Sequence, residues 1–317
     1  MITTDIKKAI KVLLNDDIIA MPTETVYGLA GNAYSENAIK KIFDLKKRPY
    51  YNPLIVHIKC ASDLNKIAVD IPNMAFKLAE KFWPGPLTLV LKKQPHILNL
   101  VTGDNDTVGI RVPHHPVALA LLNNLEFPLA APSANPFGAV SPTNALHVLN
   151  YFGESLDVIL DGGECVKGIE STIIGFKNNS PVLYRHGSIS VEEIEKVVGN
   201  LVFNINDDSK PSSPGMLSRH YAPTTAIYLT NNVNSLMKSF NGKKIGLLLF
   251  KNKVLNNKNV DQEVLSESGD LNESAKNLYA ALHRLDHKNL DLIIAERLPD
   301  IGLGKTINDR LQRAVKK

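Results

Sequence analysis

Four stretches that each join a short apolar run to a cluster of polar side chains constrain the fold of this chain most. They occupy residues 22–29 (PTETVYGL), 46–57 (KKRPYYNPLIVH), 108–116 (VGIRVPHHP) and 131–143 (APSANPFGAVSPT). Apolar runs of this length are typical of buried strands, and open α/β sheets bind ligands where such strands end. We therefore expect the four stretches to meet at one pocket, with a triphosphate at the basic stretch.

Hydrophobic spacing predicts the elements that carry these stretches. Apolar residues at helical spacing predict a helix capped by Thr3 or Thr4, and a second helix capped by Ser35 that ends at Lys46. Buried strands are expected at residues 17–21, 54–58, 87–91, 108–112, 128–132, 157–163, 168–176 and 181–187. Crossover helices alternate with hairpin-like connections, which predicts a mixed, twisted open sheet flanked by helices.

A change of composition divides the chain. Residues 204–225 are rich in Ser and Pro and show no periodicity, which predicts a linker between a first domain at 1–203 and a second at 226–317. In the second domain, strands are expected at 226–230, 244–250 and 290–296, and helices at 233–240, 271–285 and 306–314. Residues 251–269 are expected to form a polar loop. Because strands and helices alternate along this part of the chain, we expect a smaller, Rossmann-like α/β domain.

Composition and charge exclude several classes of protein. The 36 Lys and Arg residues against 32 Asp and Glu give a net charge of +4, which permits an anionic ligand without requiring one. Cys60 and Cys165 lie far apart and fit no zinc spacing, so reduced thiols are expected. The N-terminus does not resemble a signal peptide, and no apolar run approaches the ~18 residues of a membrane span. We therefore expect a cytoplasmic protein.

Each candidate residue also has a simpler interpretation. Basic residues at 46–48 are common at the end of a helix, and Arg111 is as consistent with a surface ion pair as with a ligand contact. His57 on an apolar strand is more often a core residue than a catalyst. The GLGKT segment at 302–306 lacks the first glycine of a phosphate-binding loop, because Pro299 holds that position.

Taken together, the motifs resemble one family. Residues 22–30, 46–58, 83–91, 108–113, 131–143, 169–174 and 183–187 follow the order found in the threonylcarbamoyl-AMP synthase family, whose catalytic domain is called YrdC-like. They include its K-x-R signature, Lys46 and Arg48, and its S-x-N signature, Ser133 and Asn135. The segments SPGMLSRHYAP and GLGKTINDRLQRA are similar to the linker and C-terminal end of its longer, two-domain form.

The resemblance implies a nucleotidyltransferase that joins L-threonine, bicarbonate and ATP into threonylcarbamoyl-AMP, pyrophosphate and water. Mg²⁺ would come with ATP, with no metal ligand from protein side chains. Separate proteins would then use the product to modify the adenosine next to the anticodon of tRNAs, and direct contact with tRNA stays open. The implied catalytic residues are Lys46 and Arg48. The implied threonine-binding residues are Thr25, His57, Arg111, Ala131 and Ser171. The implied ATP-binding residues are Arg48, Asn52, Thr107, Ser133, Asn135, Ser141, Arg185 and Tyr221, the last as a lid.

Two other functions are weighed against this one. An RNA-binding module would use the basic stretch and Arg111 to hold phosphates without chemistry, but the hydroxyl and amide loops suit a small ligand better. Carbamoyl transfer, as in hydrogenase maturation factors, would need acylphosphatase-like and zinc-finger segments that this sequence lacks. The general base stays open among Lys46, His57 and bicarbonate itself.

Overall fold

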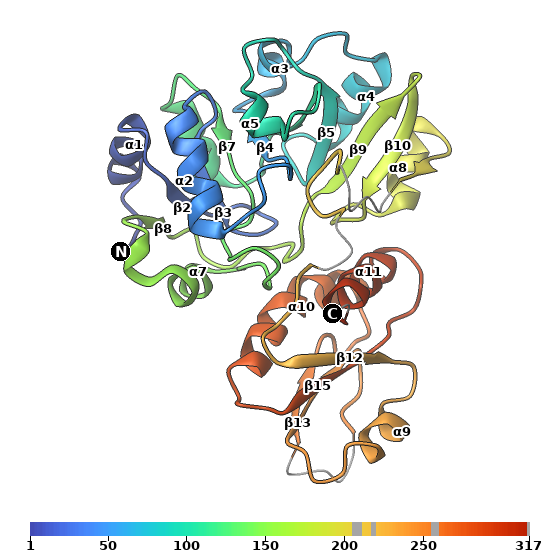
Figure 1. Cartoon of the computed structure of the whole chain (residues 1–317). Helices are drawn as coiled ribbons and strands as arrows, with labels where there is room; N and C mark the ends of the chain where they lie inside the picture. The colour runs from blue at the N-terminus through green and yellow to red at the C-terminus, as the bar shows by residue number, and fades with distance from the viewer. Residues whose placement is uncertain (205–210, 217–219, 255–259, 316–317) are drawn as a thin grey trace.

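The computed structural model describes residues 1–204, 211–216, 220–254 and 260–315. Within these residues the chain builds two sheets, one from each part of the sequence (Figure 1). The large sheet has the strand order β1-β8-β2-β3-β7-β4-β6-β5-β9-β10-β11. Its strands are β1 (Ile2–Thr3), β2 (Ile19–Met21), β3 (Gly28–Asn32), β4 (Ile55–His57), β5 (Leu87–Lys92), β6 (Thr107–Arg111), β7 (Leu129–Ala130), β8 (Ile159–Leu160), β9 (Thr172–Lys177), β10 (Ser180–Arg185) and β11 (Val202–Phe203).

The large sheet is mixed, as the sequence predicts. Parallel pairs such as β4 with β6 alternate with antiparallel pairs such as β5 with β6 and β4 with β7. The flanking helices are α1 (Ile6–Leu14), α2 (Glu36–Lys46), α3 (Leu64–Ile67), α4 (Asn73–Phe82), α5 (Asn99–Thr102), α6 (Pro116–Asn123), α7 (Ala145–Phe152) and α8 (Val191–Val198), with short 3₁₀ turns at Ala61–Asp63 and Gly153–Ser155. Alternation along β2 shows why both faces are covered: Ala20 packs in the core with α2 and α4, whereas Ile19 packs in the core with α1 and α6.

The second sheet is entirely parallel, with the order β12-β15-β13-β14. Its elements are β12 (Ala226–Thr230), α9 (Val233–Lys238), β13 (Ile245–Leu249), β14 (Asp261–Val264), α10 (Leu271–Asp286), β15 (Leu292–Glu296) and α11 (Leu303–Val315). Helices α10 and α11 cover one face of this sheet, and α9 covers the other. Such a parallel sheet with helices on both faces confirms the Rossmann-like α/β unit.

Several local predictions differ from the structure. Asp5, rather than Thr3 or Thr4, caps α1, because its carboxylate accepts from the backbone of Lys7 and Lys8. Strand β14 lies inside the expected polar loop, where pairing to β13 overrides weak strand propensity. Helix α11 begins at Leu303, so the GLGKT segment is the start of a helix and not a phosphate loop. Of the predicted linker, residues 205–210 and 217–219 lie outside the described residues.

The two units share a buried interface. Helices α10 and α11 face the first unit (Figure 1), and the core between them includes Val26 and Val140 from loops of the large sheet. Gly168 allows a close approach between the two units: it has a φ of +69°, and a Cβ there would lie 2.1 Å from the backbone oxygen of Lys276. Only glycine fits such a position without moving the helix. No helix in the described part of the chain is long and apolar enough to span a membrane.

A pair of stacked imidazoles makes this interface sensitive to acid. His147 on α7 and His283 on α10 lie with ring centroids 3.9 Å apart and planes 25° apart. Burial, and then the neighbouring His283, lowers the pKa of His147 to about 3, and burial lowers that of His283 to about 4. Both rings are therefore neutral in the folded protein at neutral pH, while in the unfolded chain they titrate near their ordinary value of ~6.5.

We expect the free energy of unfolding to fall as the pH is lowered from about 6.5 toward 4, because the unfolded chain then binds more protons than the folded one. Each such histidine contributes a slope of up to ~1.4 kcal/mol per pH unit in that window and nothing above it. Urea unfolding at pH 7.5, 6.0 and 5.0 measures the slope. The variant His283→Phe keeps the ring stack but should show a shallower slope, and an unchanged slope would contradict the prediction.

Candidate active site

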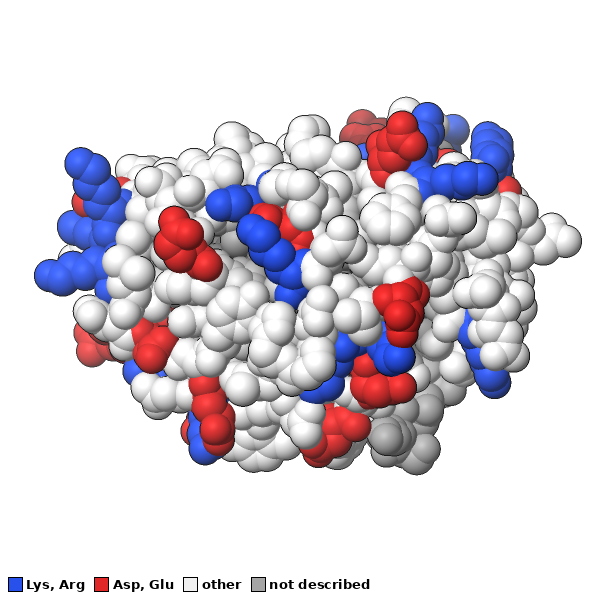
Figure 2. Space-filling view, turned by 90° about the horizontal axis from the view of Figure 1, so that it is seen from above, with Lys and Arg blue, Asp and Glu red and all other residues white. Residues whose placement is uncertain are grey.

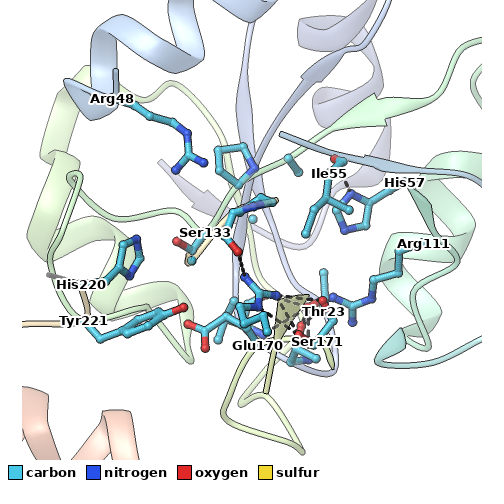
Figure 3. A pocket seen from close by; sticks show the side chains of 18 residues that line it. Thr23, Arg48, Ile55, His57, Arg111, Ser133, Glu170, Ser171, His220 and Tyr221 are labelled. Atoms are coloured by element: carbon cyan, nitrogen blue, oxygen red, sulfur yellow. Dashed lines mark hydrogen bonds between the residues drawn. The ribbon is translucent and has the colours of Figure 1, made fainter. Parts of the chain in front are cut away.

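One cavity gathers residues from all four stretches that the sequence analysis brought together. It is lined by Thr23, Thr25, Val26, Gly28, Arg48, Ile55, His57, Arg111, Ala131, Pro132, Ser133, Glu170, Ser171, Arg185, Pro214, Gly215, His220 and Tyr221 (Figure 3). The stretches do not all leave the same edge of the sheet, however. Strands β4 and β7 are antiparallel, so the loop that follows β7 leaves at the end where β4 begins, opposite the end at which His57 lies. They still meet, because β4 has only 3 residues and its two ends are close together.

One end of the cavity is built by the carboxyl ends of two parallel strands. His57 ends β4 and Arg111 ends β6, and the register pairs these two residues directly. The Arg111 guanidinium donates from Nε to the Gly85 carbonyl at 3.2 Å and from Nη1 to the Thr25 hydroxyl at 2.9 Å. Burial, and then the charge of Arg111, lowers the pKa of His57 to about 3, so its ring is neutral. This end offers a fixed positive charge beside neutral polar groups.

Arg48 stands at the other end of the cavity, opposite His57 and Arg111 (Figure 3). Its Nη2 donates to the Asn52 side chain at 2.6 Å and to the Pro53 carbonyl at 2.8 Å, while Nε donates to the Asn52 carbonyl at 3.1 Å. Asn52 is therefore the residue that orients Arg48 rather than part of the wall. Burial lowers the pKa of Arg48 to about 9, which leaves the side chain charged at neutral pH.

Lys46 lies in a different place from Arg48. It is buried and lies outside the cavity wall, where its Nζ donates to the carbonyls of Ser133 and Asn135. Burial, and then the charge of Arg48, lowers the pKa of Lys46 well below its usual value. The K-x-R and S-x-N signatures are thus joined by hydrogen bonds, and Lys46 fixes the backbone that presents Ser133. Lys47 between them is the exposed, left-handed residue that ends α2, with a φ of +52°.

The described residues of the predicted linker fold over the basic end. Pro214, Gly215, His220 and Tyr221 all line the cavity. The backbone of Ala222 donates to the Gly138 carbonyl at 2.8 Å, and Arg185 donates to the Pro214 carbonyl at 3.3 Å. Tyr221 has a φ of +62° and is 1% exposed. A left-handed tyrosine costs of order 1–3 kcal/mol and is held only where the surroundings impose it, which is typical of functional sites.

The floor of the cavity depends on the second unit. Glu170 lines the cavity, and its carboxylate accepts from the Ser141 hydroxyl at 2.6 Å, from the Tyr279 hydroxyl at 2.9 Å and from Arg310 at 3.0 Å. The Arg310 guanidinium also lies 4.6 Å from the ring centre of Tyr221. Burial raises the pKa of Glu170, but Arg310, Arg185 and hydrogen bonds such as that from Ser141 together lower it by more, so the carboxylate is charged.

Several polar atoms around the basic end have no hydrogen-bond partner within the described residues. They are Asn52 Nδ2, Asn135 Oδ1, Ser213 Oγ, His220 Nδ1 and the Tyr221 hydroxyl, all buried. Burying an unpaired polar atom is costly, so such a group marks a place for a polar ligand or water. Burial, and then the charge of Arg48, lowers the pKa of His220 well below its usual value, so its ring is neutral.

The structure thus places the residues expected from the sequence in two groups. Those that line the cavity are Thr25, Arg48, His57, Arg111, Ala131, Ser133, Ser171, Arg185 and Tyr221. Those that lie outside its wall are Lys46, Asn52, Thr107, Asn135 and Ser141, of which Thr107 begins β6 at the end away from Arg111. Three further residues that line the cavity had no role assigned from the sequence: Thr23, which lies in the 22–29 stretch, Glu170, and His220, which stands beside Tyr221 in the segment that resembles the family's linker.

Comparison with known proteins identifies the family. The sequence matches a family described as "Telomere recombination" over residues 11–187 and the "Threonylcarbamoyl-AMP synthase, C-terminal domain" over residues 189–315. The threonylcarbamoyl-AMP synthase of Pyrococcus abyssi is 42% identical over 313 residues, which is 94% of this chain and 90% of that protein. This chain belongs to the threonylcarbamoyl-AMP synthase family. It is therefore an enzyme, a nucleotidyltransferase, as the resemblance implies.

A further relative and two solved structures are similar to this chain. The threonylcarbamoyl-AMP synthase of Bacillus subtilis is 39% identical over 319 residues, covering 98% of this chain and 92% of that protein. The crystal structure of P. abyssi Sua5 complexed with L-threonine superimposes with a TM-score of 0.90 at 39% identity, covering 98% of this chain and 94% of that one. E. coli YciO, at a TM-score of 0.52 and 24% identity, shares the fold of the first unit.

Proposed function

We propose that this enzyme joins L-threonine, bicarbonate and ATP into threonylcarbamoyl-AMP, pyrophosphate and water. The observation that carries the proposal is a single cavity with two different ends. Arg111, Thr25 and His57 form an end that suits an amino acid, and Arg48 and Arg185 form an end that suits a triphosphate. The P. abyssi relative has been crystallised with L-threonine, which supports the first assignment.

In the proposed reaction the threonine nitrogen attacks the carbon of bicarbonate. A C–N bond forms, and the ammonium group gives up two protons, one to the departing hydroxide to make water and one to solvent. The carbamate oxygen then attacks the α-phosphorus, and the bond to the bridging oxygen breaks so that pyrophosphate leaves. The residues supply position and charge for these steps, since no protein nucleophile is required.

Each end of the cavity has a definite role in the proposed reaction. Arg111 holds the threonine carboxylate, with the hydroxyls of Thr25 and Ser171 and the neutral ring of His57 around it, and Ala131 contributes backbone. Arg48 and Arg185 hold the phosphates, and Ser133, Asn135, Asn52 and Ser141 shape and orient this end. Tyr221 and His220 close the cavity, which would exclude water from a labile carbamate. Thr107 stays a predicted ATP contact.

Magnesium enters the proposal with ATP. Among the described residues, no group of three or more His, Cys, Asp or Glu side chains could hold a metal ion. We propose that Mg²⁺ is carried by the triphosphate oxygens, where it would share the neutralisation of charge with Arg48. We further propose that the product serves separate proteins that modify the adenosine beside the anticodon in tRNAs, in the cytoplasm.

Pyrophosphate release tests the proposal, with threonine, bicarbonate and MgATP each supplied or omitted in turn. We expect release to require all three and to fall at least ~10-fold when threonine or bicarbonate is absent, because the carbamate is the nucleophile. Mass spectrometry should find threonylcarbamoyl-AMP in an amount equal to the pyrophosphate released. Release that does not depend on threonine would contradict the proposal.

The alternative, an RNA-binding module without chemistry, would show salt-sensitive RNA affinity and no pyrophosphate release. On the face seen in Figure 2, Lys and Arg are interspersed with Asp and Glu, rather than gathered in one basic surface. The cavity, with buried unpaired polar atoms around it, favours a small ligand instead.

A further inference from the structure

A buried carboxylate stands directly behind the arginine at the amino-acid end. Glu24 Oε1 lies 2.7 Å from Arg111 Nη2, and the side chains are 2% and 4% exposed. Both oxygens of Glu24 lack a hydrogen-bond donor within the described residues, so the contact with Arg111 is an ion pair without favourable hydrogen-bond angles. Glu24 does not line the cavity. A buried charge of this kind is costly and is kept only where it has a partner or a task.

The contacts of Arg111 leave part of its guanidinium free. A guanidinium has five N–H donors, and here Nε contacts the Gly85 carbonyl, Nη1 contacts the Thr25 hydroxyl, and Nη2 faces Glu24. Nη2 is buried against Glu24 and has no hydrogen-bond acceptor within the described residues, so the second N–H of Nη1 is the donor left for a carboxylate in the cavity. The three contacts hold the plane of the guanidinium in one orientation.

We infer that Glu24 determines the charge specificity of this end, so that it takes an amino-acid zwitterion rather than a simple carboxylate. Before a ligand binds, the Arg111–Glu24 pair is neutral as a whole. A carboxylate without an ammonium group would bring an uncompensated negative charge close to Glu24, whereas a zwitterion brings both signs. Inside a protein this difference is much less screened than in water. The inference rests on the proposed binding of threonine beside Arg111.

The phosphate end of the cavity carries a different net charge. Arg48 and Arg185 both line the cavity, Arg185 also donates to the Ser171 hydroxyl at 3.0 Å, and the Glu170 carboxylate is already paired with Arg310. That end is therefore net positive and suits phosphates.

A comparison of two ligands that differ in one group tests the inference. L-Threonine and the matching enantiomer of 3-hydroxybutyrate share the carboxylate, the hydroxyl and the methyl group, and only threonine has the ammonium. Isothermal titration calorimetry would give the dissociation constants of both for the wild type and for Glu24→Gln. We expect the wild type to prefer threonine by at least ~10-fold, and the preference to shrink about 10-fold in the variant.

The ratio of the two affinities separates charge selection from a structural effect. Lost orientation of Arg111 would weaken both ligands alike and leave the ratio unchanged, which would overturn the inference. Glu24→Asp keeps the charge and should keep the ratio within about two-fold of the wild type, and a collapsed ratio there would also overturn it. Glu192→Gln, which removes a carboxylate from the exposed ion pair with Lys305, is the matched control.

These outcomes also separate the two proposals. If the wild type binds threonine but prefers it no more than 3-hydroxybutyrate, the inference about Glu24 is wrong and the proposed function stands. If the wild type binds neither ligand and releases no pyrophosphate, the proposed function itself fails. Far-UV circular dichroism of each variant comes first, and if Glu24→Gln does not fold, Glu24→Ala, which also removes the carboxylate, takes its place and its ratio decides.

Discussion

Replacing Arg48 with alanine will lower the rate of pyrophosphate release by about 10²–10³-fold, the loss typical of removing one preorganised charge at a site of developing negative charge. Arg48 is 7% exposed, lines the cavity and is held by three hydrogen bonds to the 52–53 segment. Its charge is thus fixed in place before any ligand binds. Steady-state kinetics with threonine, bicarbonate and MgATP measures the effect.

Lys47→Ala is the matched control for this loss. Lys47 is the next residue, carries the same charge and is exposed at the end of α2. We expect it to keep at least about half of the wild-type rate, because an exposed charge is screened by water and salt. Equal losses in the two variants would mean that the general positive field of the helix end, rather than the placed guanidinium of Arg48, supports the reaction.

Replacing Arg310 with methionine will destabilise the protein by about 3–5 kcal/mol, because it leaves the buried carboxylate of Glu170 without its counter-charge. The Arg310 side chain is 1% exposed and contacts Glu170 and the His186 carbonyl, at 3.0 and 2.5 Å. Activity should fall as well, since the same guanidinium lies under the ring of Tyr221. Urea unfolding followed by the fluorescence of Trp83, the single tryptophan, measures the stability of the first unit.

Two further variants show whether the buried pair is responsible. Lys305→Ala removes a partly exposed ion pair to Glu192 across the same interface and should cost less than about 1 kcal/mol. The double variant Glu170→Gln with Arg310→Met removes both buried charges and should be more stable than Arg310→Met alone. If the double variant is no more stable than Arg310→Met alone, the pair is not coupled and the explanation is wrong.

The sequence predicts best those strands and helix caps whose local pattern needs no distant partner. The buried run at 54–58 predicts a strand, and Arg111 falls on the face of its own strand opposite Ile110 and Val112. Ser35 caps α2 as expected, because a serine before an apolar helical stripe needs no distant partner. Strand β3 and the antiparallel direction of β7 were not predicted, because the direction in which a short strand pairs depends on its neighbours in space.

The sequence by itself determined the chemical groups of the site and the segments that hold them, including Arg48, Arg111, Ser133 and Tyr221. Only the tertiary structure decided which of these groups face the cavity. In the folded chain Lys46 donates to the carbonyls of Ser133 and Asn135, and Glu24 forms an ion pair with Arg111. The tertiary structure also brought Arg310 to Glu170 across 140 positions of the chain. Local patterns report periodicity and turn chemistry, whereas the partner of a buried charge is fixed by packing between distant elements.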